Sequence, residues 1–121
     1  MKMMNSLAVS AAVLAFAFTG HAGAYCVHNQ SDTTMHVDQS KNGSFWKRFN
    51  VKLDPGQQAC CSWTSKDCNK SGGQTDAVGF SVYHSEFNYI DCGATIPANG
   101  DMCISGTPGN YRCVPNSTTC K

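Results

Sequence analysis

Two adjacent cysteines, Cys60 and Cys61, constrain the fold of this chain more than any other feature. Successive side chains of a β-strand point to opposite faces, so these two sulfur atoms cannot reach the same partner. A bridge between the two neighbours would close a small, strained ring. We therefore expect one of them to point into the core and the other to point outward, toward an edge or a loop, with Cys68 as a candidate partner.

The spacing of the cysteines favours disulfides over metal ligands. The chain has eight: Cys26, Cys60, Cys61, Cys68, Cys92, Cys103, Cys113 and Cys120. None of them forms the C-x-x-C pair that structural zinc sites commonly use. An even number permits four bridges with no thiol left over, in any of about 105 pairings. We expect a disulfide framework, with no metal and no cofactor.

The first 24 residues have the pattern of a signal peptide. Lys2 precedes an apolar run over residues 7–19, and small residues follow at 22–24. The run is shorter than the roughly 20 residues that a membrane-spanning helix needs. We predict cleavage after Ala24 and a single secreted, extracellular, cysteine-rich domain over residues 25–121. Eight cysteines in 97 residues are typical of a small secreted module that depends on disulfides.

Charge excludes one class of partner. Without Lys2, eight Lys and Arg residues balance eight Asp and Glu residues. Nucleic-acid binding needs a clear basic excess to contact phosphates. We therefore expect no nucleic-acid partner, and no later apolar run is long enough to provide a stable membrane anchor.

Short alternating runs separated by turn residues predict an all-β fold. Residues 25–30 and 33–39 flank Ser31 and Asp32 and predict a first hairpin. Further strands are expected near residues 49–53, 57–63, 77–84, 87–92, 94–96, 101–106 and 111–114. The expected inward residues are Phe49, Val51, Leu53, Val78, Phe80 and Val82. We predict a small disulfide-stapled antiparallel β-sandwich or barrel of seven to eight short strands.

The same alternation suggests a ligand surface. Residues that alternate with the inward ones face solvent, and parity adds a tryptophan to them. The candidate surface is Trp46, Arg48, Asn50 and Lys52. An exposed tryptophan flanked by cations suits sugar stacking or an anionic lipid surface. The alternative is that Trp46 covers the edge of a small core and that its neighbours form a solvated face.

Histidines and carboxylates offer two further sites. His28 and His36 would face each other across the first hairpin, where a pair can bind a metal; ordinary surface histidines are the alternative. His84 and Glu86 would lie on one face of a strand and suggest a small hydrolase or ribonuclease. No other motif supports an enzyme, so we assign no catalytic residue. In turn-like contexts, Asp76, Asp91 and Asp101 are expected to cap backbone groups.

Four N-x-S/T sequons make the chain a candidate glycoprotein. Their asparagines are Asn29, Asn42, Asn69 and Asn116. All four fall in or beside predicted turns, where a glycan can project without disturbing the packing.

The mature region resembles the small secreted cysteine-rich proteins of fungi and fungus-like microbes. The resemblance lies in the segments YCVHN, LDPGQQACCSW with DCN, VGFSVY, CG, IPANGDMCISG and YRC. It implies an extracellular module with an effector-like or defence-related role. We therefore expect a non-enzymatic protein that binds an extracellular glycan or another component of a cell wall or cell surface. A small secreted hydrolase and a membrane-active killer-type toxin are the alternatives.

Overall fold

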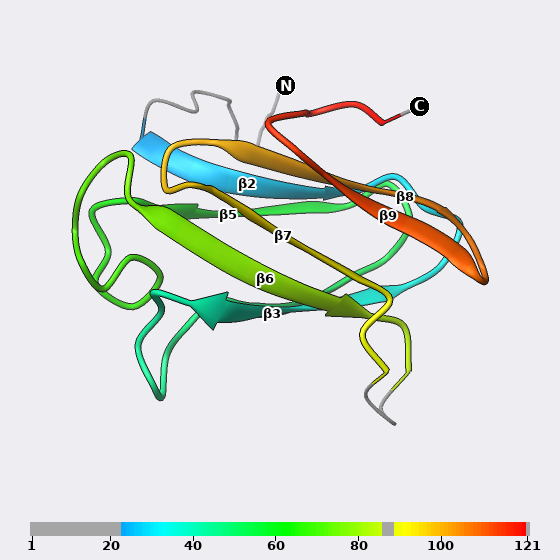
Figure 1. The fold of residues 1–121 in the computed structure, drawn as a ribbon, viewed down its shortest axis with the longest axis horizontal. Coiled ribbons are helices and arrows are strands. Elements are labelled where there is room, and N and C mark those ends of the chain that lie inside the picture. Colours follow the sequence, from blue (N-terminus) through cyan, green and yellow to red (C-terminus); the bar gives the residue numbers. More distant parts are fainter. Residues whose placement is uncertain (1–22, 86–88, 121) are drawn as a thin grey trace, which may run out of the picture.

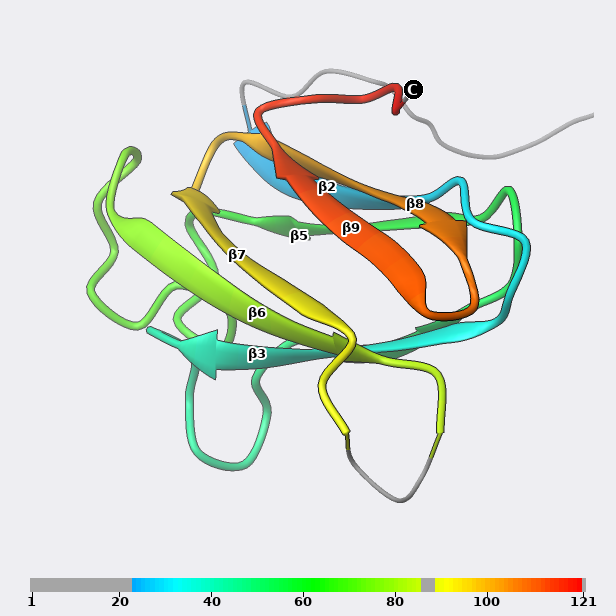
Figure 2. The same ribbon diagram turned by 45° about the vertical axis from the view of Figure 1, so that its right-hand side comes forward.

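The computed structural model describes residues 23–85 and 89–120 of the 121-residue chain. Eight strands form two four-stranded sheets that pack face to face as a β-sandwich (Figures 1 and 2). In chain order they are β2 (Ala24–Asn29), β3 (Met35–Lys41), β4 (Asn50–Leu53), β5 (Gln58–Ser62), β6 (Ala77–Tyr83), β7 (Cys92–Pro97), β8 (Asp101–Thr107) and β9 (Asn110–Pro115). The sheets do not close into a barrel, so the prediction of a β-sandwich is confirmed. The eight strands agree with the predicted seven to eight.

The first sheet has the strand order β5-β2-β8-β9 and the second has the order β4-β3-β6-β7. Every neighbouring pair is antiparallel except β2 and β8, which run parallel. The expected turn at residues 54–56 joins β4 to β5, with Gly56 at a φ of 87°. Residues 97–100 turn as expected between β7 and β8, where the N–H of Gly100 donates to the carbonyl of Pro97 over 2.8 Å.

The predicted first hairpin is wrong, because β2 and β3 lie in different sheets. The buried side chain of Asn29 turns the chain from one sheet to the other. Its Oδ1 accepts from the N–H and hydroxyl of Ser31, over 3.0 and 2.7 Å. Its Nδ2 donates to the carbonyls of Thr33 and Leu53, over 2.9 and 2.8 Å. These hydrogen bonds pair polar groups of the segment that crosses between the sheets. The chain therefore crosses to the other sheet here instead of forming a tight hairpin turn.

The core fills the space between the two sheets. Buried side chains from both sheets include Tyr25, Val27, Met35, Val37, Phe49, Leu53, Val78, Phe80, Val82, Ile96, Met102, Ile104 and Tyr111. All six residues that were expected to face inward do so, with Val51 only partly buried. The expected strand over 87–92 is wrong for residues 89–91, which lie in the loop between β6 and β7.

A buried glutamine, Gln39, hydrogen-bonds to two core residues and to two backbone carbonyls. The side chain of Gln39 is 2% exposed. Its Oε1 accepts from the N–H of Phe49 over 3.2 Å and from the hydroxyl of Tyr25 over 3.3 Å. Burial raises the pKa of Tyr25 above its usual range, so this hydroxyl stays protonated and donates. The Nε2 of Gln39 donates to the carbonyls of Lys41 and Cys68, over 3.0 and 2.9 Å.

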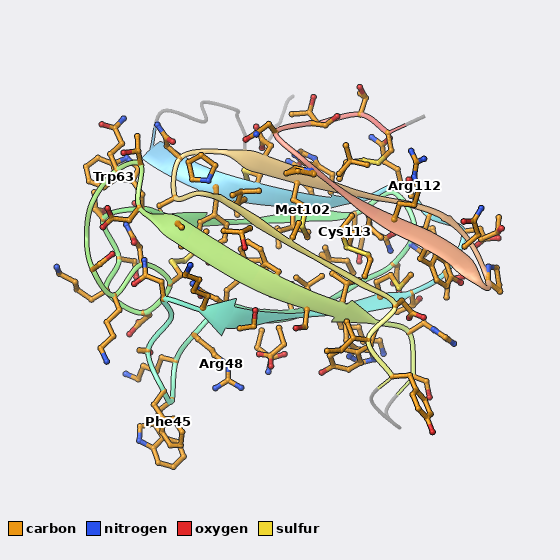
Figure 3. All side chains as sticks on the ribbon, in the orientation of Figure 1. Phe45, Arg48, Trp63, Met102, Arg112 and Cys113 are labelled. Atoms are coloured by element: carbon orange, nitrogen blue, oxygen red, sulfur yellow. A yellow bond between two sulfur atoms is a disulfide. The ribbon has the colours of Figure 1, made fainter. Side chains whose placement is uncertain are left out.

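Four disulfides use all eight cysteines and leave no free thiol. They are Cys26–Cys60, Cys61–Cys68, Cys92–Cys113 and Cys103–Cys120. Of the four, only Cys92–Cys113 joins the two sheets, by linking β7 to β9. Figure 3 shows Cys113 where these two strands approach each other.

The adjacent cysteines diverge as expected. Cys60 is exposed and bridges Cys26, which lies directly opposite it on the neighbouring strand. Cys61 packs against the core and bridges the fully buried Cys68. The predicted partner Cys68 therefore belongs to the inward cysteine and not to the outward one, because the loop that carries Cys68 folds back onto the core.

Candidate functional site

Two strongly exposed aromatic residues lie next to each other on the loop that connects β3 to β4. Phe45 is 74% exposed and Trp46 is 87% exposed. Their rings meet edge to face, with centroids 4.6 Å apart. Figure 3 shows Phe45 at the tip of this loop, which projects away from the second sheet. We call residues 45–47 the aromatic turn.

Local hydrogen bonds shape the aromatic turn. The hydroxyl of Ser44 accepts from the N–H of Lys47 over 3.0 Å, which caps the start of the turn as serine commonly does. Asn42 precedes it with a φ of 66°, a left-handed conformation that asparagine tolerates. Gly43 leaves room for close packing, because a Cβ there would lie 2.6 Å from the Cβ of Arg48 and from Oε1 of Gln39. The sequence K-N-G-S before the aromatic pair thus defines the turn.

Arg48 fastens the aromatic turn to the sheet. Its Nε and Nη2 donate to the carboxylate of Asp38, over 3.0 and 3.3 Å. Its Nη1 donates to the carbonyl of Phe45 over 2.9 Å. The hydrogen bonds that Arg48 donates to Asp38, followed by the charge of that carboxylate, raise the pKa of Arg48 above its usual value. The guanidinium therefore stays charged and joins strand β3 to the turn.

A second loop, over residues 63–76, holds the aromatic turn from the other side. The N–H of Ser44 donates to the carbonyl of Asp67, and the N–H of Lys70 donates to the carbonyl of Asn42, each over 2.8 Å. The N–H of Ser71 donates to Oδ1 of Asn42 over 3.0 Å. Since Cys68 ties this loop to Cys61, the support of the turn is itself crosslinked to the first sheet.

An open hollow of about 280 Å³ lies beside the aromatic turn. Its lining is mostly polar and comprises Asp38, Gln39, Ser40, Lys41, Asn42, Gly43, Ser44, Phe45 and Arg48. Carboxylate, guanidinium, hydroxyl and amide groups are therefore close together, with one aromatic ring at the rim. The hollow therefore offers hydrogen-bonding groups to a ligand but does not enclose one in an apolar pocket.

The structure divides the predicted ligand surface. Strand β4 begins at Asn50, so Trp46 and Arg48 lie in the preceding loop and not on the strand. Asn50 and Lys52 are exposed on β4, opposite Asp38 and His36 of β3 respectively. Arg48 and Asn50 therefore both lie next to Asp38, whereas Lys52 lies farther along the sheet. The parity argument placed Trp46 in solvent but assigned it to the wrong kind of element.

The two histidines of the expected metal pair do not face each other across a hairpin, because their strands lie in different sheets. Nε2 of His28 lies 3.2 Å from a carboxylate oxygen of Asp101. His36 stacks on Tyr83, with ring centroids 5.4 Å apart and planes 8° from parallel. Within residues 23–85 and 89–120, no three His, Cys, Asp or Glu side chains come close enough to hold a metal ion.

His84 pairs with a carboxylate, although Glu86 lies outside the described residues. Nδ1 of His84 lies 2.6 Å from Oδ2 of Asp91, which also accepts from the backbone N–H of His84 over 2.8 Å. Asp91 thus caps the backbone as expected. Asp76 does the same for Gly73, whose N–H donates to it over 2.7 Å. Asp101 instead begins β8 and contacts His28.

The four sequon asparagines differ in exposure. Asn29 and Asn69 are fully buried, Asn42 is half-buried and Asn116 is exposed. The expectation that a glycan can project from every one of them is therefore wrong for Asn29 and Asn69, because their side chains are part of the packed interior.

Sequence reasoning missed Phe45, Asp38 and the hollow, and it also missed a second exposed apolar pair, Tyr89 and Ile90. These two residues are 81% and 62% exposed and lie in the loop between β6 and β7. The described parts of that loop lie on the same side of the second sheet as the aromatic turn, at the opposite end of the strands (Figures 1 and 2). Phe45 had one sequence signal, which was its place beside Trp46 after the turn-forming residues 42–44.

In the part of the chain that the structure describes, no helix is long and apolar enough to cross a membrane. No protein-family model matches the chain, and a search of curated proteins found no match.

Proposed function

We propose that this chain is a secreted, non-enzymatic module that binds a glycan of a cell wall or cell surface through the aromatic turn and the adjoining hollow. The observation that carries the proposal is the exposure of Phe45 and Trp46 on a turn that is held in place on two sides. Four disulfides are typical of extracellular modules of this size. One of them, Cys61–Cys68, crosslinks the loop over residues 63–76 that supports the turn.

The chemistry of the turn matches that of a sugar. A pyranose ring has an apolar face that packs on an aromatic ring, and hydroxyl groups at its edge that need hydrogen-bond partners. Trp46 offers a ring that is 87% exposed, and the hollow next to Phe45 offers the carboxylate of Asp38 and the hydroxyls of Ser40 and Ser44. A rigid turn also lowers the entropy that would be lost when the ligand binds.

A lipid surface fits the same turn less well. Peripheral attachment to an anionic bilayer relies on an excess of Lys and Arg around the inserted residues. Here the predicted mature region has no net excess of positive charge, and the hollow next to Phe45 is mostly polar. Binding to vesicles is therefore the competing outcome of the test and not the proposal.

The proposal is tested by screening the purified protein on a glycan array and on insoluble cell-wall polysaccharides, with neutral and anionic lipid vesicles in parallel. We expect binding to at least one polysaccharide and none to vesicles. Binding to vesicles alone would support the membrane-active alternative. Binding to neither would overturn the assignment of the aromatic turn as a ligand site.

A second candidate function, hydrolysis of RNA or another polymer, has one observation in its favour. A carboxylate that fixes a histidine ring is the usual way to orient a general base, and Asp91 holds His84 in this manner. If this pair is catalytic, the purified protein cleaves RNA and His84→Ala abolishes the cleavage. Absence of cleavage, or unchanged cleavage by the variant, rejects it.

A further inference from the structure

We infer that Asn116 is the sequon asparagine that carries an N-linked glycan when this chain folds in a secretory pathway that glycosylates proteins. The inference rests on how the fold uses the amide nitrogen of each of the four sequon asparagines. It does not depend on what the aromatic turn binds.

N-glycosylation requires Nδ2 of the asparagine to be accessible during the transfer and to remain exposed in the folded protein. Nδ2 of the asparagine attacks C1 of an oligosaccharide that is linked to a lipid diphosphate. An N–C bond forms, the bond from C1 to the diphosphate oxygen breaks, and the lipid diphosphate leaves with the electron pair while the amide gives up one proton. Because this transfer occurs before folding is complete, the folded protein must afterwards accommodate a bulky glycan at Nδ2.

Two of the four sequons cannot meet this condition. Nδ2 of Asn29 donates to two carbonyls in the buried crossing between the sheets, as described above. Nδ2 of Asn69 donates to the carbonyls of Trp63 and Gly73, over 2.7 and 3.0 Å. Both residues are 0% exposed. A glycan on either nitrogen would replace a donor hydrogen and leave a buried carbonyl without its partner.

Asn42 fails for a related reason. Its Nδ2 lies within hydrogen-bond distance of Oδ1 of Asn69, Oγ of Ser71 and the carbonyl of Ala77, at 2.9, 2.8 and 3.2 Å. Three acceptors thus surround this nitrogen, which forms the junction between the aromatic turn and the loop over 63–76. A glycan there would separate the two loops.

Asn116 differs from the other three asparagines in its exposure and in the hydrogen bonding of its Nδ2. It is exposed, and it follows the last residue of β9. Its backbone N–H donates to the carbonyl of Asp101 over 2.6 Å, so the backbone at this position is held in place. Among the described residues, Nδ2 of Asn116 has no hydrogen-bond partner. Thr118, the third residue of the sequon, is also exposed.

The position of Asn116 leaves the candidate site open. The segment after β9 lies on the side of the first sheet, whereas the aromatic turn projects from the second sheet (Figures 1 and 2). A glycan at Asn116 would therefore shield the end of β9, which is an edge strand, without covering the hollow.

The test is expression of the full chain behind a host secretion leader in yeast or mammalian cells, followed by intact mass measurement and peptide mapping after enzymatic removal of N-glycans. Enzymatic removal converts a glycosylated asparagine to aspartate, which identifies the site. We expect a single glycosylated position, at Asn116, in the secreted, folded protein. Asn116→Gln should yield a protein without any N-glycan.

Thr118→Ala is a second variant that destroys the sequon and keeps the asparagine, and it should also remove the glycan. Aspartate at Asn29, Asn42 or Asn69 in the secreted protein would overturn the inference. An unmodified Asn116 in the secreted protein would overturn it as well.

Discussion

Arg48 and Asp38 form a two-point ion pair at the base of the aromatic turn, with contacts of 3.0 and 3.3 Å. The same guanidinium donates to the carbonyl of Phe45. One side chain therefore couples strand β3 to the segment that presents Phe45 and Trp46.

Arg48→Lys should loosen the aromatic turn, because lysine keeps the charge but has no planar fork to contact Asp38 and the Phe45 carbonyl together. The pair is partly exposed, so we expect little change in the free energy of unfolding. The main effect should be lower backbone order at residues 44–47, measured by ¹⁵N relaxation. Lys47→Ala is the control and should leave this order unchanged. Equal order in wild type and Arg48→Lys would contradict the role of the ion pair.

Gln39→Ala should be among the more destabilising polar substitutions in the chain. The substitution leaves two donors, the hydroxyl of Tyr25 and the N–H of Phe49, without their acceptor. It also leaves the carbonyls of Lys41 and Cys68 without their donor. We expect a loss of about 2–4 kcal/mol in the free energy of unfolding, measured with urea. Gln58→Ala, at an exposed position of β5, should change it by less than about 0.5 kcal/mol. A similar loss in both variants would show that Gln39 has no special role.

The inward-facing residues at β4 were predictable from the sequence, but the pairing of the strands was not. Alternation placed Phe49, Val51 and Leu53 on the inner face correctly, because the facing of a strand residue depends only on its neighbours in the chain. Alternation does not specify which strands pair. The crossing at Asn29 and the parallel pairing of β2 with β8 depend on contacts between distant segments, so the predicted first hairpin was wrong.

The candidate site was predictable only in part, for the same reason. Trp46 could be placed in solvent by parity, but the turn that carries it depends on Asn42 and on a loop more than 20 residues away. The divergence of Cys60 and Cys61 followed from local geometry alone. Their partners did not, since the pairing of cysteines is set by the completed fold.

Removal of the inter-sheet disulfide by a Cys92→Ala/Cys113→Ala double variant should destabilise the sandwich. The cysteines are 21 residues apart, and chain-entropy arguments give a loss of about 3 kcal/mol for a loop of this size. The Cys61–Cys68 bridge spans only 7 residues, so its removal should cost less, about 2.5 kcal/mol by the same argument. Denaturant unfolding of both double variants provides the comparison. The opposite order would show that strain or packing, and not loop closure, dominates.

Acid should weaken the support of the aromatic turn through Asp76. A hydrogen bond from Ser71, followed by one from the backbone of Gly73, lowers the pKa of Asp76 in the folded state. A lowered folded-state pKa means that this carboxylate stabilises the fold above its unfolded-state pKa of about 3.9. That contribution is lost as the pH falls through the folded-state pKa.

The measurement is the urea midpoint of wild type and Asp76→Asn between pH 7 and pH 2. Wild type should be the more stable protein at neutral pH, and the two curves should converge as the pH falls below about 4. A difference that stays constant across this range would exclude the ionised carboxylate as its source.

The most direct test of the proposed glycan-binding site at the aromatic turn is calorimetric titration of wild type, Trp46→Ala and Tyr89→Ala. The titrant is an oligosaccharide that the glycan array shows to bind. Trp46 and Tyr89 are both exposed aromatic residues, but only Trp46 lies on the aromatic turn. Loss of a central aromatic contact commonly costs about 2 kcal/mol, so affinity should fall by roughly 30-fold in Trp46→Ala. Tyr89→Ala should bind as wild type does. Equal affinity of wild type and Trp46→Ala would contradict the site.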